Sequence, residues 1–205
     1  MTPDERPGPP AVRVARAAEW LVIGELFGDA FFDDPLWAWM ATDPVRRRRH
    51  LGTLFAHVVR PLVASGFGYT NEDRSGAAVW AAPNGWKTTT RESIPLALPF
   101  LRLTGLGDLR TRLAALEQMD RIHPTEPHWY LEIVGADPSR RGRGIGSSIL
   151  EPGVERCDVE GMPAYLESSK EENIPLYARY GFEVLDEVTL APGAPPIWPM
   201  WREPR

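Results

Sequence analysis

Residues 140–147 read Arg140-Arg141-Gly142-Arg143-Gly144-Ile145-Gly146-Ser147, and this glycine- and arginine-rich stretch decides the fold class. The apolar residues 128–136 before it predict a strand, and residues 145–160 after it predict a helix. A second strand is predicted over residues 164–167. The order strand, glycine loop, helix, strand is a βαβ unit, so we expect the two strands to be parallel neighbours.

The same loop has the composition of an anion site. Backbone N–H groups at a helix N-terminus are unpaired and carry partial positive charge, and glycines let an anion approach the main chain. A pyrophosphate or phosphate site is the functional interpretation, and a plain glycine-rich turn with solvated arginines is the alternative. No lysine follows the glycines, which excludes a P-loop. A dinucleotide fingerprint is a near miss, because Ser147 stands where the third glycine belongs.

The rest of the chain predicts a mixed sheet with flanking helices. We expect helices over residues 20–31 and 44–65, a hairpin over 67–82, two helical pieces between 96 and 122, and a short helix over 173–180. Further strands are expected over residues 182–190 and 197–201. Pro152 and Gly153 lie inside the helix after the loop and should weaken or kink it.

The composition of the chain excludes several classes of function. The chain has 205 residues and a formal charge of -5, so the basic footprint of a nucleic-acid-binding domain is absent. We expect a loose leader over residues 1–10, one domain over 11–205, no membrane span and a monomer or homodimer. A single cysteine suits the reducing cytoplasm. The four histidines have no metal-ligand spacing, so no metal site is predicted.

Two linked motifs identify a family resemblance. The first, Arg141-x-x-Gly144-x-Gly146, resembles the signature of the GNAT superfamily of acyl-CoA-dependent N-acyltransferases, and residues 173–182 (NIPLYARYGF) resemble its downstream segment. Residues 126–201 also resemble the puromycin N-acetyltransferase group. The resemblance implies an α/β (α+β) GNAT fold with a mixed central sheet of about six to seven strands. Two splayed parallel strands would form the acetyl-CoA site.

The resemblance also implies roles for individual residues. Tyr177 occupies the general-acid position, where a phenol with an unperturbed pKa near 10 stays protonated while a thiolate forms. Main-chain groups of Val134 and Ala136 would pair with the pantetheine arm of acetyl-CoA. The remaining cofactor-binding residues would be Arg141, Gly142, Arg143, Gly144, Ile145, Gly146, Ser147 and Asn173.

The acceptor side is predicted from residue chemistry. Glu132 lies on the strand before the loop, where alternation puts its side chain on one face with Tyr130 and Val134. A half-buried carboxylate has a raised pKa, so Glu132 is a candidate general base, although it could instead select a cationic substrate. Aromatic side chains that could wall the acceptor pocket are Phe31, Phe32, Trp37, Trp80 and Tyr130.

We therefore expect an N-acetyltransferase that moves the acetyl group of acetyl-CoA to a primary amine of a small molecule, such as an aminonucleoside or another amine antibiotic. The amine would attack directly in a ternary complex. One alternative is a protein lysine or N-terminal acetyltransferase, which would need an open groove. Another is a non-catalytic sensor that binds acyl-CoA.

Overall fold

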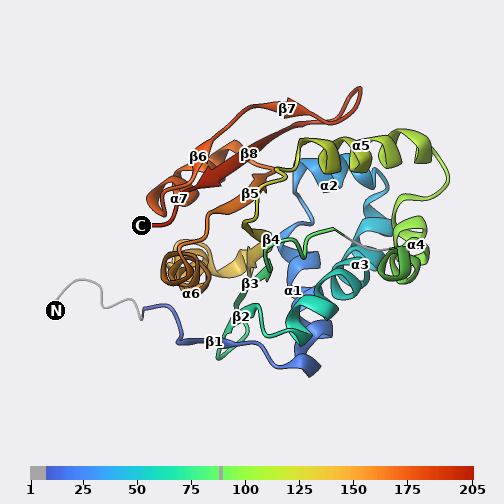
Figure 1. Cartoon of the computed structure of the whole chain (residues 1–205). Helices are drawn as coiled ribbons and strands as arrows, with labels where there is room; N and C mark the ends of the chain where they lie inside the picture. Colours follow the sequence, from blue (N-terminus) through green and yellow to red (C-terminus); the bar gives the residue numbers. More distant parts are fainter. Residues whose placement is uncertain (1–7, 88–89) are drawn as a thin grey trace.

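A computed structural model describes residues 8–87 and 90–205, so residues 1–7 of the expected leader lie outside the description. Eight strands within the described residues form one sheet in the order β1-β2-β3-β4-β5-β8-β6, with β7 paired to β8 (Figure 1). The strands are β1 (Val12–Val14), β2 (Gly68–Asn71), β3 (Gly76–Ala81), β4 (Trp129–Ala136), β5 (Ala164–Ser168), β6 (Glu183–Val184), β7 (Val188–Thr189) and β8 (Pro196–Arg202).

Helices cover both faces of the sheet. They are α1 (Trp20–Ala30), α2 (Pro35–Met40), α3 (Pro44–Ala64), α4 (Thr90–Thr104), α5 (Leu109–Ile122), α6 (Ile145–Glu160) and α7 (Ile174–Arg179). Figure 1 shows α6 on one face, while α1 and α3 lie on the other. Each face buries its own apolar cluster: Trp80, Leu131 and Ile149 belong to the α6 side, and Phe27, Phe55 and Ile133 to the α1 and α3 side.

The predicted βαβ unit is confirmed. Strand β4 pairs with β5 in parallel, α6 covers the expected residues 145–160, and every other pairing in the sheet is antiparallel. The sheet has eight strands and not the expected six to seven, because residues 182–190 form two short strands, β6 and β7, instead of one. Both pair with β8, and the intervening residues carry the chain from one end of β8 to the other.

Two Asp-Pro pairs start helices in the N-terminal half. The carboxylate of Asp43 accepts hydrogen bonds from the amides of Val45 and Arg46 and so caps α3, which begins at the predicted residue 44. Asp34 caps α2 in the same way, accepting from Leu36 and Trp37. The helix α2 was not predicted, although Asp34-Pro35 carries the same signal.

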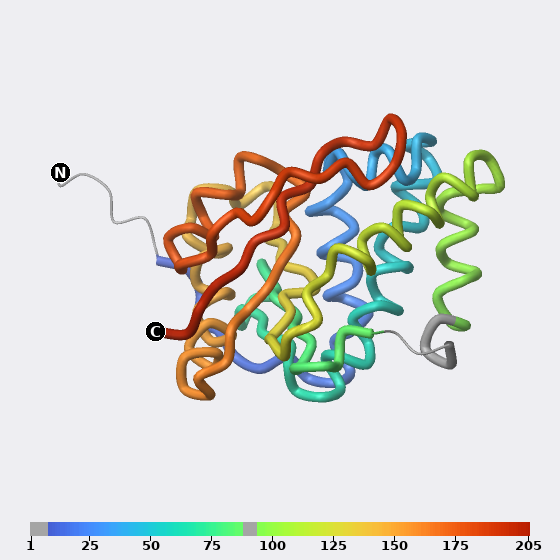
Figure 2. The backbone as a smooth tube through the Cα atoms, turned by 45° about the horizontal axis from the view of Figure 1, so that its top comes forward, coloured from blue at the N-terminus to red at the C-terminus, as the bar shows by residue number. Residues whose placement is uncertain are grey.

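The β7–β8 hairpin reaches across to the N-terminal half. Figure 2 shows its turn beside α2. Leu36 and Met40 of α2, Ala115 of α5 and Ile197 of β8 form a third buried cluster there. Residues far apart in the sequence are therefore joined by apolar packing on the side of the sheet opposite α6.

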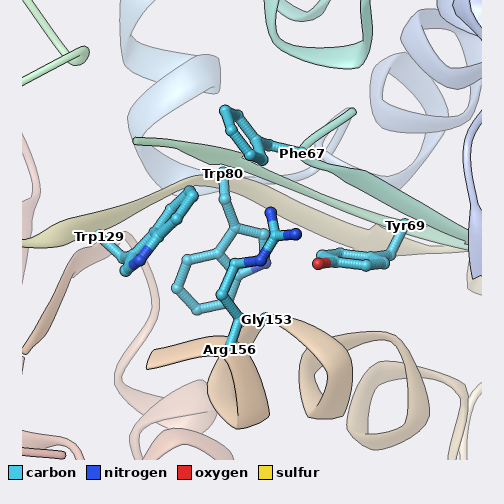
Figure 3. A pocket seen from close by; sticks show the side chains of 6 residues that line it. All are labelled: Phe67, Tyr69, Trp80, Trp129, Gly153 and Arg156. Carbon is cyan, nitrogen blue, oxygen red and sulfur yellow. The ribbon is translucent and has the colours of Figure 1, made fainter. Parts of the chain in front are cut away.

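The Pro152-Gly153 pair has a packing reason. Helix α6 runs continuously through Pro152, so the pair does not end the helix. The indole of Trp80 lies against Gly153, where a Cβ atom would stand 2.2 Å from the ring (Figure 3). Glycine at 153 is therefore required for α6 to approach β3, and Phe67, Tyr69, Trp129 and Arg156 fill the space around the indole.

Candidate functional site

The two parallel strands separate after a single step of pairing. Trp129 pairs with Ala164 and Tyr130 with Tyr165, and beyond them β4 has no further partner on β5. On its other edge β4 stays paired with β3 as far as Ala136. The open edge of β4 therefore begins at Leu131 and includes Val134 and Ala136, the two residues predicted to receive an extended ligand arm.

Glu132 stands at an irregularity of β4. Val79 pairs with Ile133 and Trp80 pairs with Leu131, so Glu132 has no partner on β3 and forms a β-bulge. The bulge breaks the alternation of faces that the sequence predicts. Val134 packs with the α6-side cluster, so the expectation that it shares a face with Tyr130 and Glu132 was wrong.

The face opposite α6 carries several polar side chains near the point of separation. Tyr130 donates a hydrogen bond of 2.8 Å to Glu167 Oε2, and Glu167 is almost fully buried. Burial, followed by the charges of Glu167 and Asp120, raises the pKa of Glu132 to about 8. Glu132 is therefore mostly protonated at neutral pH, and its carboxylate form becomes the major one above a pH of about 8.

The glycine loop has the geometry of an anion site. Gly142 and Gly144 have φ values of 77° and 73°, the left-handed region that glycine tolerates best. Gly144 is the N-cap of α6, and it has no side chain that could cap the first amides of the helix. Arg141 and Arg143 are exposed, and neither has an ion-pair partner among the described residues. Arg140 instead pairs with Asp73 and Asp137, so it is less available to a ligand.

The other predicted loop residues divide between surface and core. The Ile145 side chain is buried and fills the space that the absent side chain of Gly76 leaves open. Gly146 faces Leu176 of α7, and the main-chain oxygen of Ser147 accepts a hydrogen bond of 2.9 Å from the Tyr180 hydroxyl. These contacts hold the start of α6 against α7. Of residues 145–147, only main-chain groups and the Ser147 side chain therefore remain available to a ligand.

Tyr177 and Asn173 lie close together at α7. Asn173 precedes the helix and is partly exposed, and its side chain makes no capping bond. The Tyr177 side chain is 6% exposed. Burial, together with the charge of Asp34, raises the pKa of Tyr177 above its ordinary value. The phenol therefore stays protonated across the physiological range, as a proton donor requires.

Asp34 is a residue of this region that the sequence did not reveal. It is 1% exposed, and its Oδ2 atom accepts a hydrogen bond of 2.6 Å from the Ser169 hydroxyl. Burial raises the pKa of Asp34, while the bonds from Ser169 and the α2 amides oppose that rise. The Asp-Pro signal predicts a helix start. No local sequence pattern predicts that the Asp34 side chain also bonds to Ser169, which follows β5.

The predicted aromatic wall is only partly assembled. Phe31 and Trp37 both pack on Phe55, and Phe31 approaches β4 where Gly135 has no side chain. Phe32 stacks instead with the guanidinium groups of Arg47 and Arg48. Trp80 is 1% exposed in the core on the α6 face, so it departs from the predicted role on the acceptor side (Figure 3).

Two further features are absent from the described residues. No cluster of three histidine, cysteine, aspartate or glutamate side chains suited to hold a metal ion occurs among the side chains that the structure describes. In the same part of the chain, no helix has the length and apolar character that would let it cross a membrane.

Splayed parallel strands, a glycine loop that starts a helix and a tyrosine on the next short helix define the acetyltransferase fold of the GNAT type. Residues 110–182 match the model of the Acetyltransferase (GNAT) family. An uncharacterized N-acetyltransferase of Schizosaccharomyces pombe is 28% identical over 189 residues, which cover 84% of this chain and 74% of that protein.

Solved structures of acetyltransferases have a fold similar to that of this chain. A Corynebacterium glutamicum protein described as histone acetyltransferase HPA2 and related acetyltransferase superposes with a TM-score of 0.70 and 25% identity, covering 96% of this chain and 97% of that one. An apo-form agmatine N-acetyltransferase mutant gives a TM-score of 0.66 at 16% identity, covering 94% and 98%. The chain has the GNAT fold, and these matches support an acyl-CoA-dependent N-acetyltransferase.

Proposed function

We propose that the chain transfers the acetyl group of acetyl-CoA to the primary amine of a small, positively charged molecule by direct attack in a ternary complex. One observation carries the proposal: the open edge between β4 and β5 runs from the carboxylate of Glu132 to the glycine loop. GNAT enzymes use acetyl-CoA in general. An extended arm could pair with the main chain of this edge, because no strand of the described residues pairs with it beyond Tyr130.

The residues that would hold the cofactor follow from this edge. Main-chain groups of Val134 and Ala136 would pair with the pantetheine arm. The α6 N-terminus from Gly142 to Ser147 would bind the pyrophosphate, with Arg141 and Arg143 adding charge-assisted contacts. Asn173 is partly exposed at the start of α7 and would add a polar contact.

Acid and base chemistry would be divided between two side chains. Acetyl-CoA supplies the acetyl group as a thioester. Glu132 would accept the proton that the ammonium form of the acceptor loses before attack, since its raised pKa of about 8 suits proton uptake near neutral pH. Tyr177 would donate a proton to the leaving thiolate, because burial keeps its phenol protonated.

The acceptor is inferred from the face that carries Glu132. Glu132, Glu167 and Asp120 are three carboxyl groups near the separation of the strands, and they favour a cation over a neutral or anionic acceptor. The structural likeness to an agmatine N-acetyltransferase points in the same direction. The motif resemblance keeps aminonucleoside and other amine antibiotics as candidates. Cys157, which is buried and free, is compatible with a cytoplasmic enzyme.

An acetylation screen tests the proposal. Purified protein and acetyl-CoA are incubated with agmatine, polyamines, arylalkylamines, amine antibiotics and a lysine peptide, and thiol release is measured. We expect turnover with at least one small cationic amine and a higher kcat/KM for it than for the peptide. Turnover confined to the peptide would reject the small-molecule acceptor. Acetyl-CoA binding without any turnover would reject the enzyme in favour of a sensor.

A further inference from the structure

A hollow lies at the surface where α2, α5 and the β7–β8 turn meet (Figure 1). Its volume is about 560 Å³, within the range of roughly 300–1,000 Å³ that is usual for small-molecule sites. Its wall includes Trp39, which belongs to α2, the first turns of α5 and two residues of the β7–β8 turn, Ala191 and Pro192. The hollow is therefore large enough to hold a small molecule.

Arg112 brings a buried guanidinium to the wall of this hollow. The residue is 4% exposed, and its Nη1 group donates a hydrogen bond to the main-chain oxygen of Trp39. Within the described residues, Nε has no hydrogen-bond partner, and the ion-pair contact of Nη2 with Asp108 Oδ2 is 4.0 Å long. A guanidinium has five N–H donors, so most of those of Arg112 are not used by the described part of the chain.

The positive charge of Arg112 is only weakly compensated. The Asp108 side chain is 81% exposed, so water screens its attraction to the guanidinium. The Trp39 ring lies 5.5 Å from the guanidinium carbon, a cation–π contact that supplies part of the compensation. Because a buried charge without a close counter-ion is costly, an anion bound in the hollow would be stabilised by Arg112.

The other lining residues indicate which kind of anion fits. Asp108 and Arg110 are both exposed at the hollow, and their opposite charges offset each other. The one charge that remains, on Arg112, matches a monoanion better than a phosphate dianion. A guanidinium binds a carboxylate through charge-assisted hydrogen bonds. Trp39, Ala191 and Pro192 add apolar surface, so the hollow suits a carboxylate with an apolar or aromatic body.

The hollow is separate from the cofactor edge and the acceptor face. None of its described lining residues belongs to β4 or to the glycine loop. Arg112 precedes Asp120 on α5 by eight positions, which is about 12 Å along the helix axis. Asp120 acts on Glu132, on the face that carries carboxyl groups. The acceptor face and the hollow therefore suit ligands of opposite charge.

We propose that this hollow is a binding site for a small organic carboxylate, which Arg112 holds by its charge and which packs against Trp39. The bound carboxylate would contact α2, α5 and the β7–β8 turn at once and so stabilise their arrangement. The inference does not depend on the proposed function, because the binding needs neither acetyl-CoA nor an acceptor amine.

Nitrogen-15 NMR spectra locate the bound anion. Benzoate is titrated into the protein at pH 7, benzamide serves as an uncharged probe of the same shape, and inorganic phosphate serves as a second anion. We expect saturable shifts of the Trp39 indole N–H and the Thr111 amide, with a Kd for benzoate of about 1 mM or lower and a Kd for benzamide at least about tenfold higher.

Three outcomes would overturn the site itself. They are an equal Kd for benzamide, shifts confined to the amides of residues 142–147, and the lack of a saturable Trp39 shift at about 10 mM benzoate. Tighter binding of phosphate than of benzoate at Trp39 would overturn the carboxylate as the class of ligand.

Variants of α5 test the role of charge. Ala114→Glu puts a negative charge into the wall of the hollow at an exposed helix position, where the fold should persist, and we expect the Kd for benzoate to rise at least about tenfold. Leu113→Glu makes the same change of charge at a residue that is 44% exposed and outside the described wall, so this matched control should keep the wild-type Kd.

Arg112→Gln removes the proposed binding group and should abolish benzoate binding. The Ala114 and Leu113 variants decide the question even if the loss of the bond to Trp39 unfolds this third variant. A Kd that Ala114→Glu leaves unchanged, or that Leu113→Glu raises by as much, would overturn the proposal.

Discussion

The carboxylate of Asp34 and the hydroxyl of Ser169 form a buried hydrogen bond of 2.6 Å between residues that are 135 positions apart. Asp34 begins α2, and Ser169 follows β5 on the way to Asn173 and Tyr177. The bond therefore ties the segment that carries Phe31 and Trp37 to the segment that carries the proposed proton donor. The cap of a six-residue helix thus helps to fix the acceptor side against the cofactor side.

Replacing Asp34 should separate its capping role from its charge. Asp34→Ala removes the α2 cap and leaves the Ser169 hydroxyl unpaired, so we expect the free energy of unfolding to fall by about 2–3 kcal/mol. Asp34→Asn keeps a good cap and should lose about 1 kcal/mol or less. Urea unfolding measures both changes. An Asp34→Ala variant as stable as the wild type would contradict the structural role.

Tyr177→Phe tests the proton donor. The change removes one hydroxyl from a buried ring that packs on Phe182, so the fold and the Kd for acetyl-CoA should persist. We expect kcat to fall by roughly a hundredfold or more, since the thiolate would leave without a proton. Tyr69→Phe, on the α6 face of the sheet, is the matched control and should keep its kcat. Equal kcat values in wild type and Tyr177→Phe would reject the assignment.

The two exposed arginines of the glycine loop should each strengthen the binding of acetyl-CoA. Arg141→Ala and Arg143→Ala each remove an exposed charge near the α6 N-terminus, and we expect about a fivefold higher Kd for acetyl-CoA, about 1 kcal/mol. Both effects should shrink at high salt because exposed charges are screened. Arg110→Ala, an exposed arginine on α5, is the control. Calorimetric titration that gives the same Kd for all three variants would exclude the pyrophosphate contact.

Local sequence signals were enough to predict the βαβ unit, because its elements are marked by strong boundaries. The glycine loop ends β4 and starts α6, and Gly142 and Gly144 adopt the positive φ angles that such a loop requires. The same kind of signal at Asp34-Pro35 predicts a helix start, yet α2 was missed because it is only six residues long. Short elements carry too little periodicity to be recognised.

The site was less predictable because it depends on pairings across the sheet. Alternation along β4 put Val134 on the face of Glu132, but the bulge opposite Val79 and Trp80 reverses the later residues. The contact between His123 and His128 likewise arises from the turn 124–127 that brings α5 back to β4. Neither feature has a local sequence pattern, since each is fixed by the register with another segment.

Gly153→Ala should show how closely α6 packs on the sheet. A methyl group at this position would stand 2.2 Å from the Trp80 indole, so the helix or the ring must shift. Overpacking of this kind costs about 1–3 kcal/mol of folding free energy, and thermal unfolding should show a lower Tm. Gly107→Ala, where nothing lies within 4 Å of the new Cβ, is the control. An unchanged Tm in Gly153→Ala would contradict the close packing of α6 on the Trp80 indole.

Glu132→Gln should alter both stability and rate in a pH-dependent way. Because burial and two neighbouring carboxylates raise the pKa of Glu132 to about 8, the wild-type fold favours the protonated form. The stability from this group is therefore full below its unfolded pKa near 4.5 and is lost as the pH rises through 8. Glutamine is neutral at every pH, so we expect Glu132→Gln to gain about 1–3 kcal/mol relative to wild type between pH 5 and pH 9.

The kinetics of the same variant distinguish the two roles considered for Glu132. If it is the general base, the wild-type kcat rises with pH through an apparent pKa near 8, and Glu132→Gln lowers kcat by roughly a hundredfold and abolishes that rise. If it only selects a cation, the variant raises KM for the amine and leaves kcat unchanged, because binding alone is lost. Asp120→Asn, which removes a more distant charge, should only shift the rise to lower pH, since it lowers the pKa of Glu132 without removing the base.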